Sequence, residues 1–223
     1  QQTERNATGI GMKISATIIT LNEQKNIKDC LESLDFADEI VVVDSGSVDQ
    51  TEEICRSYQN VRFFQHAWQG YGKQKNKAAE LAANKWIINI DADERVSPEL
   101  ASNILSAEYS RYNCFKMTRR NFFGKRWVKH CGWYPDYTAR LYNSSDCSFS
   151  ERPVHESLVC DGAVGVLSGD LLHFSYDGIG DYLQRMNRYS SLAAQELYER
   201  GYTSGVKDLI SRPIATFLRM YLL

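Results

Sequence analysis

Short apolar runs recur along the first half of the chain and are separated by longer segments with a different pattern. The runs cover residues 14–20, 40–43, 61–64 and 86–90 and are rich in Ile, Val and Phe. Runs of this length and composition predict β-strands. Because the run at 40–43 is apolar at every position, we expect it to be a central strand of a parallel sheet that is covered on both faces.

The segments between these runs carry apolar residues at helical spacing. Asn22 and Glu23 are expected to open the first helix. Its inward face is predicted to consist of Ile27, Cys30, Leu31 and Leu34. A second helix start is indicated at residues 47–53, because Ser47 and Asp49 can cap a helix and the two glutamates that follow would stabilise the positive end of its dipole.

Two further helices are predicted downstream. Residues 73–84 are strong helix formers, with Ala78 and Leu81 facing inward. Ser97 and Pro98 indicate another helix, with Ser as the N-cap and Pro at the first helical position. This alternation of strands and helices predicts an α/β fold with a mostly parallel sheet and helices on both faces. Ligands of such sheets bind beyond the carboxyl ends of the strands.

Composition excludes several classes of protein. The 223 residues include 26 Lys and Arg against 28 Asp and Glu, a formal net charge of −2, which argues against a dedicated nucleic-acid binder. No apolar stretch approaches the roughly 20 residues of a membrane-spanning helix. Residues 1–12 are polar and patternless up to Met12 and are interpreted as a disordered extension or cloning remnant. We expect a globular protein, either soluble or bound at a membrane surface.

The cysteines favour a reduced protein. They are Cys30, Cys55, Cys114, Cys131, Cys147 and Cys160. None forms a CxxC pair or a cluster with zinc spacing. A chain of this size can form a core without disulfides, so we expect free thiols and a cytosolic location.

Acidic residues follow two of the predicted strands. Asp91 and Asp93 come directly after the run at 86–90, where two carboxylates can share a hard cation that bridges phosphate oxygens. The alternative role of this DxD is a helix-capping turn. Asp44 ends the run at 40–43, where an acidic side chain either accepts hydrogen bonds from a nucleoside or caps the next helix. No GxGxxG or GxxxxGK[ST] motif is present, which disfavours a dinucleotide site and a P-loop.

Three segments in order, TIITLNEQKNIKDCLESL, EIVVVDSGSVDQT and GYGKQKNKAAELAANKWIINIDADE, resemble family 2 glycosyltransferases of the GT-A fold. The likeness covers about residues 13–95. PDYTARLY and RPVHESL resemble the subfamily of lipopolysaccharide core β-1,4-glucosyltransferases and extend the match to about residue 177. The resemblance implies a GT-A catalytic domain at 13–177, with a nucleotide-binding half at 13–95 and an acceptor half at 96–177.

The resemblance also implies roles for individual residues. Donor binding would involve Thr20, Asn22, Glu23, Asp44, Lys75, Asp91 and Asp93. Asn76, beside Lys75, would lie near the nucleotide and its phosphates. Asp93 would be the direct ligand of Mg²⁺ or Mn²⁺, with Asp91 nearer the ribose of a UDP-sugar. Transfer in this family inverts the anomeric configuration, and the sugar of the subfamily is glucose.

An inverting transfer needs a general base for the acceptor hydroxyl. Glu156, in PVHESL, matches the position of the subfamily's His-Glu pair and is the favoured candidate, with Asp136 and Glu151 as alternatives. Glu156 would otherwise form an ion pair with Arg152 or Arg140. The Glu-Asp pair of many relatives is missing here.

Residues 122–142 are unusually aromatic and basic. Trp133 and Tyr134 could stack on sugar rings, and Arg140 could meet an anionic acceptor or the donor diphosphate. The alternative is an ordinary aromatic core with solvated cations. His173 would be either a third metal ligand or a hydrogen-bonded core histidine.

The last segment, residues 178–223, is predicted to form amphipathic helices. From residue 210 onward one face carries Ile210, Ile214, Phe217 and Tyr221, with Arg212 and Arg219 opposite. A basic amphipathic helix suits the cytoplasmic surface of an inner membrane and a lipid-linked glycan acceptor. The alternatives are packing against the core or a second subunit.

Three rival functions remain open from the sequence. The same chemistry could act on a polyprenyl phosphate or a protein. A nucleotidyltransferase also uses acidic strand ends and a metal, although it would carry a Gly-rich basic loop near its start. A non-catalytic nucleotide-sugar-binding protein is the third.

Overall fold

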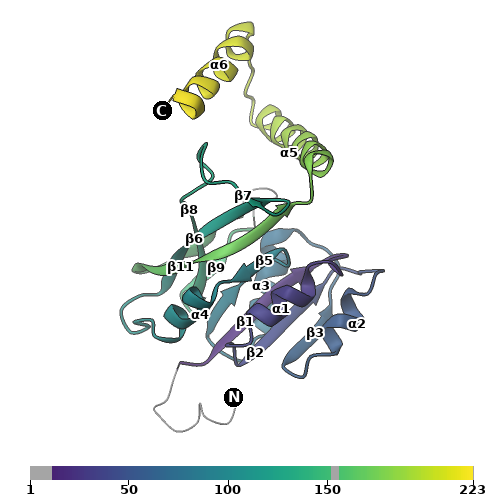
Figure 1. Ribbon diagram of the computed structural model, residues 1–223, viewed down its shortest axis with the longest axis vertical. Coiled ribbons are helices and arrows are strands. Elements are labelled where there is room, and N and C mark those ends of the chain that lie inside the picture. Colours follow the sequence, from purple (N-terminus) through teal and green to yellow (C-terminus); the bar gives the residue numbers. More distant parts are fainter. Residues whose placement is uncertain (1–11, 152–155, 223) are drawn as a thin grey trace. The chain divides into compact units, whose positions relative to one another are not determined.

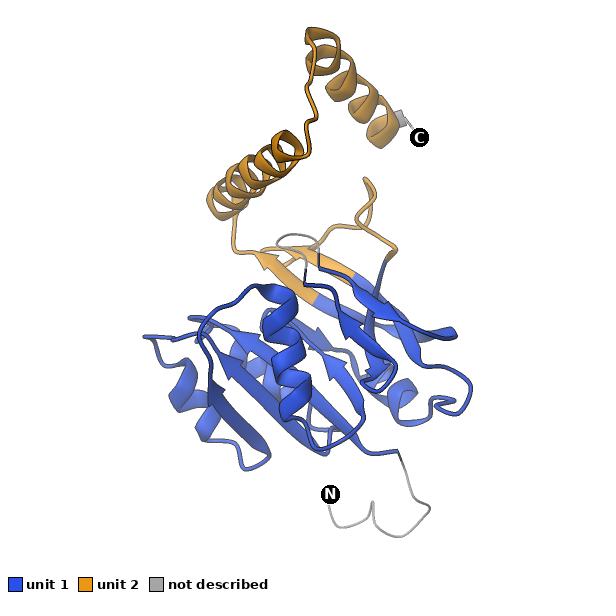
Figure 2. Cartoon of the chain, turned by 180° about the vertical axis from the view of Figure 1, so that it is seen from behind, with its two compact units in different colours: residues 1–119, 137–172 blue, residues 120–136, 173–223 orange. Residues whose placement is uncertain are grey.

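The computed structural model describes residues 12–151 and 156–222. Two compact units divide the chain, unit 1 with residues 1–119 and 137–172 and unit 2 with residues 120–136 and 173–223 (Figure 2). The expected boundary at residue 178 is not one of these divisions and stays a prediction. The extension expected at residues 1–12 lies outside the described residues, apart from Met12.

Unit 1 is built on a parallel sheet. Its strands are β1 (Ile14–Thr20), β2 (Glu39–Asp44), β3 (Val61–Gln65) and β4 (Trp86–Asn89). β1 pairs in parallel with β2 and β4, and β2 pairs in parallel with β3, so the carboxyl ends of all four strands lie along one edge. The register sets Thr20 opposite Asp44. All four predicted strands are confirmed.

The rest of the chain extends this sheet. It adds β5 (Glu94–Val96), β6 (Cys114–Phe123), β7 (Arg126–Trp127), β8 (Asp136–Asn143) and β11 (Val164–Tyr176). The order is β3-β2-β1-β4-β8-β6-β11-β5, with β7 paired to β6. Because β8 runs antiparallel to β4, the sheet is mixed. A separate hairpin consists of β9 (Cys147–Phe149) and β10 (Leu158–Cys160).

Helices cover both faces of the sheet, as predicted (Figure 1). They are α1 (Ile27–Ser33), α2 (Thr51–Arg56), α3 (Tyr71–Leu81) and α4 (Pro98–Leu105). The side chains of successive β2 residues point alternately to the two faces of the sheet. Ile40 and Val42 pack with residues of α1, α2 and α4, whereas Val41 and Val43 pack with α3. This two-residue period explains why the strand is apolar throughout.

The first two helices begin later than predicted. α1 begins at Ile27 and α2 at Thr51, although the predicted inward face of α1 is buried as expected. Asn22 has a positive φ of 57°, which no helix contains. The residue before α2 is Gln50, whose side chain makes no capping hydrogen bond. Asp49 Oδ1 instead accepts from the amide of Thr51, the first residue of α2, at 3.0 Å, and the Ser47 hydroxyl donates to Asp44. At α4 the predicted cap is confirmed, because the Ser97 side chain accepts from the Leu100 amide.

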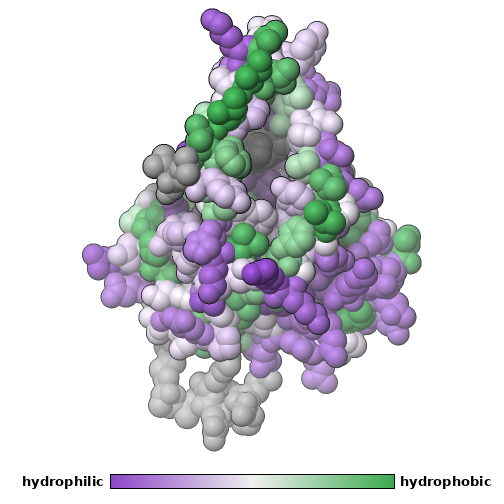
Figure 3. All heavy atoms as spheres, turned by 45° about the horizontal axis from the view of Figure 1, so that its top comes forward, coloured by the Kyte–Doolittle hydropathy of each residue, from purple (hydrophilic) through white to green (hydrophobic). Residues whose placement is uncertain are grey.

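Unit 2 contains two exposed amphipathic helices, α5 (Ile179–Glu199) and α6 (Val206–Leu222). Figure 3, which brings this part of the chain toward the viewer, shows hydrophobic residues on its surface. The exposed apolar side chains of α6 include Leu209, Ile210, Ile214, Phe217 and Tyr221. None of the helices within the described residues is long and apolar enough to cross a membrane.

A buried cluster of charged and polar side chains lies beneath the carboxyl end of β4. Arg140, on β8, is 4% exposed and donates to Glu94 Oε1 at 2.7 Å and to Asp91. It also donates to Asn89 Oδ1, and the Asn89 amide donates in turn to Thr17 Oγ1. Burying a guanidinium is unfavourable unless carboxylates and hydrogen bonds compensate it, so this cluster fixes the turn after β4.

Replacing Arg140 with Met should therefore destabilise unit 1. The change leaves the buried Glu94 carboxylate and Asp91 without their main cation, and we expect a loss of about 3–5 kcal/mol in the free energy of unfolding. Urea unfolding of wild type and Arg140→Met measures it. Arg111→Met is the control, since Arg111 pairs with Glu108 on the surface, where about 0.5 kcal/mol or less is expected. Equal losses in the two variants would contradict a structural role for the buried cluster.

Candidate active site

The loops that follow β1 and β2 are joined by hydrogen bonds. The Asn22 amide donates to Ser47 Oγ at 2.8 Å, and Asn22 Oδ1 accepts from the Val48 amide at 2.9 Å. The Glu23 amide donates to Thr51 Oγ1 at 2.9 Å. Asn22 and Glu23 thus lie on the edge where the sequence predicted a donor site. Their contacts show how the rim of that edge is held in shape.

Asp44 lies under this rim and is fully buried. Its Oδ2 accepts from the amides of Gly46 and Ser47 at 2.8 and 2.7 Å, and its Oδ1 accepts from the hydroxyls of Thr20 and Ser47. The carboxylate therefore caps its own turn, not helix α2. Thr20 and Asp44 shape the loops from beneath, and direct contact of either with a nucleoside stays a prediction.

Three consecutive residues of α3 each hold a different segment of the site. Gln74, which is fully buried, donates to Ser45 Oγ at 3.1 Å and to the His66 carbonyl at 2.9 Å. It thereby joins the loops after β2 and β3. Lys75 and Asn76 reach the other side, toward β4 and the β9–β10 hairpin. The sequence analysis assigned no role to Gln74.

Lys75 is the centre of the site. Its side chain is 4% exposed, and its Nζ lies 3.2 Å from Asp91 Oδ1 and 3.0 Å from Glu156 Oε1. The same ammonium lies 5.2 Å from the centre of the Phe149 ring. One buried cation thus connects the first aspartate of the DxD with the favoured general base. The ion pair of Glu156 is with Lys75, whereas the sequence analysis considered Arg140 and Arg152. Arg152 lies outside the described residues.

The two aspartates of the DxD have different surroundings. Burial acts to raise the pKa of the Asp91 carboxyl, but Arg140 and Lys75 outweigh it and hold that pKa well below its usual range. Both carboxylate oxygens of Asp91 are engaged by these cations. The backbone carbonyl of Asp91 also accepts a hydrogen bond from the Glu94 amide at 2.8 Å. This bond closes a tight turn that contains the half-buried Asp93.

This arrangement bears on the predicted metal. Among the described residues no group of three or more His, Cys, Asp or Glu is placed to hold an ion. Mg²⁺ is commonly bound through one or two carboxylates together with substrate phosphates. Because Asp91 already compensates two cations, the donor set suits an ion held by Asp93 and phosphate oxygens better than one chelated by both aspartates.

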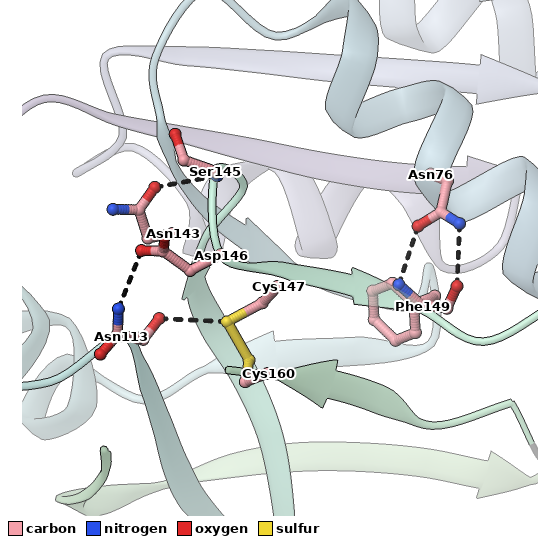
Figure 4. The surroundings of a disulfide bond; sticks show 8 residues. All are labelled: Asn76, Asn113, Asn143, Ser145, Asp146, Cys147, Phe149 and Cys160. Carbon is pink, nitrogen blue, oxygen red and sulfur yellow. Dashed lines mark hydrogen bonds between the residues drawn. A yellow bond between two sulfur atoms is a disulfide. The ribbon is translucent and has the colours of Figure 1, made fainter. Parts of the chain in front are cut away.

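Asn76 contacts protein backbone. Its side-chain Nδ2 donates to the Phe149 carbonyl at 2.9 Å, and its Oδ1 accepts from the Phe149 amide at 2.8 Å (Figure 4). The resemblance placed this side chain near the donor phosphates. In the structure its amide holds β9, and its proximity to the donor phosphates stays a prediction.

The hairpin that Asn76 holds contains a disulfide between Cys147 and Cys160 (Figure 4). The expectation of free thiols throughout is therefore wrong for these two residues. β9 and β10 pair antiparallel with Cys147 directly opposite Cys160, a proximity that depends on the hairpin register and not on residue spacing alone. Cys30, Cys55, Cys114 and Cys131 are free, as expected.

The alternative bases lie in other surroundings. Glu151 is exposed, with its Oε2 3.8 Å from Lys73 Nζ. Asp136, in unit 2, accepts from Asn121 Nδ2 at 3.2 Å. Glu156 is therefore the candidate that the structure joins to Asp91 through Lys75. His155, which precedes it, lies outside the described residues.

His173 belongs to unit 2. Its Nδ1 lies 2.7 Å from Asn121 Oδ1 and 2.8 Å from Ser175 Oγ. These contacts are those of a hydrogen-bonded histidine of the strand β11, the second of the two roles considered. Its predicted alternative, a third metal ligand, finds no support among the described residues.

Trp133 and Tyr134, the predicted acceptor residues, lie in two different aromatic groups of unit 2. Trp127 lies edge-to-face with Tyr134, and the cations of Arg120 and Lys129 each lie 4.6 Å from the Trp127 ring centre. The second group includes Phe123, Trp133, Tyr176 and Tyr182. Trp133 and Tyr134 thus stay acceptor candidates. Arg140 is buried in unit 1, where it contacts Asp91 and Glu94, and its contact with an acceptor or a donor diphosphate stays a prediction.

Comparison with known proteins assigns a family. The model of the family "Glycosyl transferase family 2" matches residues 15–162, more than half of the chain. The lipopolysaccharide core biosynthesis glycosyltransferase LpsC of Rhizobium meliloti is 34% identical over 94% of this chain and 81% of its own length. An uncharacterized glycosyltransferase of Rickettsia felis is 33% identical over 85% of this chain and 71% of its own length.

Solved structures agree on the fold. S. aureus TarS 1-349 superposes with a TM-score of 0.56 at 20% identity, over 74% of this chain and 61% of the TarS chain. The match supports the predicted GT-A architecture, with its sheet and covering helices. Family membership also separates this protein from nucleotidyltransferases, since the matching model spans the donor loops, the DxD and Glu156. The chain belongs to glycosyl transferase family 2.

Proposed function

We propose that this glycosyltransferase moves a sugar from a UDP-sugar to a hydroxyl of a lipopolysaccharide inner-core glycan, with inversion of configuration. The observation that carries the proposal is the buried Lys75 ammonium between Asp91 and Glu156. It joins the predicted donor side and the predicted base at one edge of the sheet. The relative LpsC, named for lipopolysaccharide core biosynthesis, supports the acceptor class.

The donor is proposed to be a uridine nucleotide sugar. TarS, which shares the fold, has been crystallised with UDP and with UDP-GlcNAc. Here the loops after β1 and β2 would receive the nucleoside, and Lys75 and Asp93 would face the diphosphate. A Mg²⁺ or Mn²⁺ ion held by Asp93 and the phosphate oxygens would neutralise charge on the leaving diphosphate. Glucose, taken from the subfamily resemblance, is the proposed sugar.

Glu156 is proposed as the general base. Its Oε1 lies 3.0 Å from Lys75 Nζ, which places the side chain next to the proposed donor side of the site. It would take the proton of the acceptor hydroxyl while that oxygen forms a bond to the anomeric carbon. The bond from the anomeric carbon to the phosphate oxygen breaks, and its electron pair leaves with UDP. Lys75 would stabilise the charge that develops on the leaving group.

A lipid-linked acceptor would bring the enzyme to the cytoplasmic surface of the inner membrane. The α6 helix has an exposed apolar face, which includes Ile210, Ile214 and Phe217, and carries Arg212 and Arg219. Such a helix can lie in the interface of an anionic membrane. Polyprenyl-phosphate and protein acceptors are the alternatives for the same chemistry.

The donor assignment predicts metal-dependent binding of UDP. Calorimetric titration with UDP, UDP-glucose and UDP-galactose, each with and without Mn²⁺, should show binding that the metal strengthens. Asp93→Asn should weaken metal-dependent binding by about tenfold or more, which corresponds to ~1.4 kcal/mol. The exposed Asp35→Asn is the control. If no uridine nucleotide binds, the proposed donor class is rejected. If the metal dependence of binding is unchanged in Asp93→Asn, Asp93 is rejected as the metal ligand.

The base assignment predicts a loss of turnover. Glu156→Gln keeps the shape of the side chain but removes the proton acceptor, so kcat should fall by about 10²–10⁴-fold with the affinity for UDP nearly unchanged. Transfer to a deacylated core oligosaccharide is measured. Glu151→Gln, on the same hairpin, should retain activity. A large loss in Asp136→Asn with full activity in Glu156→Gln would move the base to Asp136.

The membrane assignment predicts that α6 mediates vesicle binding. Phe217→Gln removes an exposed aromatic from the apolar face, and binding to vesicles with anionic lipid should weaken by about tenfold or more, since burying a Phe contributes roughly 1.5–3 kcal/mol. Ala215→Gln, on the opposite face by helical spacing, is the matched control in a sedimentation assay. If Phe217→Gln instead changes only the oligomeric state, the apolar face contacts a second subunit.

A further inference from the structure

The β9–β10 hairpin, which carries Glu156 beside β10, is internally braced. β9 and β10 pair antiparallel, with Phe149 opposite Leu158 and Cys147 opposite Cys160. Beyond these strands, the Ser150 amide donates to the Ser157 carbonyl at 2.9 Å, and the Ser157 amide donates to Ser150 Oγ at 3.1 Å. The Cys147–Cys160 disulfide adds a covalent link. A shift of β9 along its axis would therefore carry Glu156 with it.

Helix α3 holds this hairpin at two places. The Asn76 side chain makes both hydrogen bonds that a neighbouring strand would make to Phe149, one to its amide and one to its carbonyl (Figure 4). One turn earlier, Gly72 lies so close to the hairpin that a Cβ there would be 2.1 Å from the Ser150 carbonyl oxygen. The hairpin thus has direct backbone contact with the helix.

The same contacts set the position of Lys75. Its ammonium lies over the Phe149 ring and 3.0 Å from Glu156 Oε1. A slip of β9 by one residue would break both bonds of Asn76 and turn the Phe149 ring to the opposite face, because side chains alternate along a strand. Lys75 would then lose the ring and Glu156 together.

We propose that Asn76 is a positioning residue, which fixes the register of the β9–β10 hairpin on α3 and thereby holds Glu156 against Lys75. The inference rests on the proposed function of Glu156. Both hydrogen-bonding groups of the Asn76 side chain contact the backbone of Phe149, so Asn76 would act through the hairpin. Gly72 permits the close approach that this register requires.

A double-mutant cycle tests the proposal. Asn76→Ala removes both bonds to Phe149, and Asn76→Asp keeps the shape but replaces the donor with an oxygen that faces the Phe149 carbonyl. Each should lower kcat by about 10–100-fold while UDP affinity stays within about threefold. In the Glu156→Gln background the same changes should have no further effect. Asn103→Ala is the matched control, since its amide donates to the Ser168 carbonyl away from the site.

Hydrogen exchange provides a readout that does not depend on catalysis. Peptides covering residues 147–160 should exchange about tenfold faster or more in Asn76→Ala than in wild type, and Asn103→Ala should leave them unchanged. Asn76→Asp serves the same comparison if Asn76→Ala does not fold. Unchanged exchange in the hairpin would overturn the proposal.

Two further outcomes separate the proposal from the function on which it rests. An equal loss of kcat in the wild-type and Glu156→Gln backgrounds, or a loss of UDP binding, would show that Asn76 acts independently of Glu156 and would overturn it. Full activity of Glu156→Gln would instead reject Glu156 as the base. In that case, the rate of amide hydrogen exchange in the hairpin alone shows whether Asn76 positions this segment.

Discussion

The arrangement of side chains at the candidate active site depends on two buried cations that carboxylates must compensate. Lys75 and Arg140 are both nearly inaccessible to water, and each must contact carboxylates because an isolated charge in a protein interior is strongly unfavourable. Asp91 lies between them and contacts both. Through Lys75 and Arg140, helix α3 and strand β8 both contact this single carboxylate in the turn after β4.

The ion pairs with Lys75 and Arg140 distinguish the first aspartate of the DxD. Asp91 is ionised and engaged within the protein, and Glu94 shares its partner Arg140. Asp93 follows in the same turn and is half-buried. In a motif whose sequence suggests a symmetrical pair of metal ligands, the first aspartate already compensates two cations. Asp93 as the metal ligand stays a proposal.

Helix α3 connects the parts that a transferase must coordinate. Gln74 contacts the loops after β2 and β3, Lys75 contacts Asp91 and Glu156, and Asn76 holds the β9–β10 hairpin. Adjacent residues on a helix point in directions about 100° apart, so three in succession can reach three separate segments. A small displacement of α3 would consequently move the loops after β2 and β3 together with the β9–β10 hairpin. This coupling is a property of unit 1 alone.

Local patterns of the sequence determined the four parallel strands, the inward face of α1 and the Ser97 cap of α4. They also located Asp44, Asp91, Asp93, Lys75 and Glu156 as site candidates, partly through the family resemblance. They could not reveal the roles of Gln74, Glu94 and Asn76, nor the Cys147–Cys160 disulfide. Helical and strand periods act over a few residues, whereas Lys75 and Glu156 are 81 residues apart and Asn76 and Phe149 are 73 apart. Such partners are chosen by strand order and hairpin register, so only the tertiary structure decided which buried charge meets which.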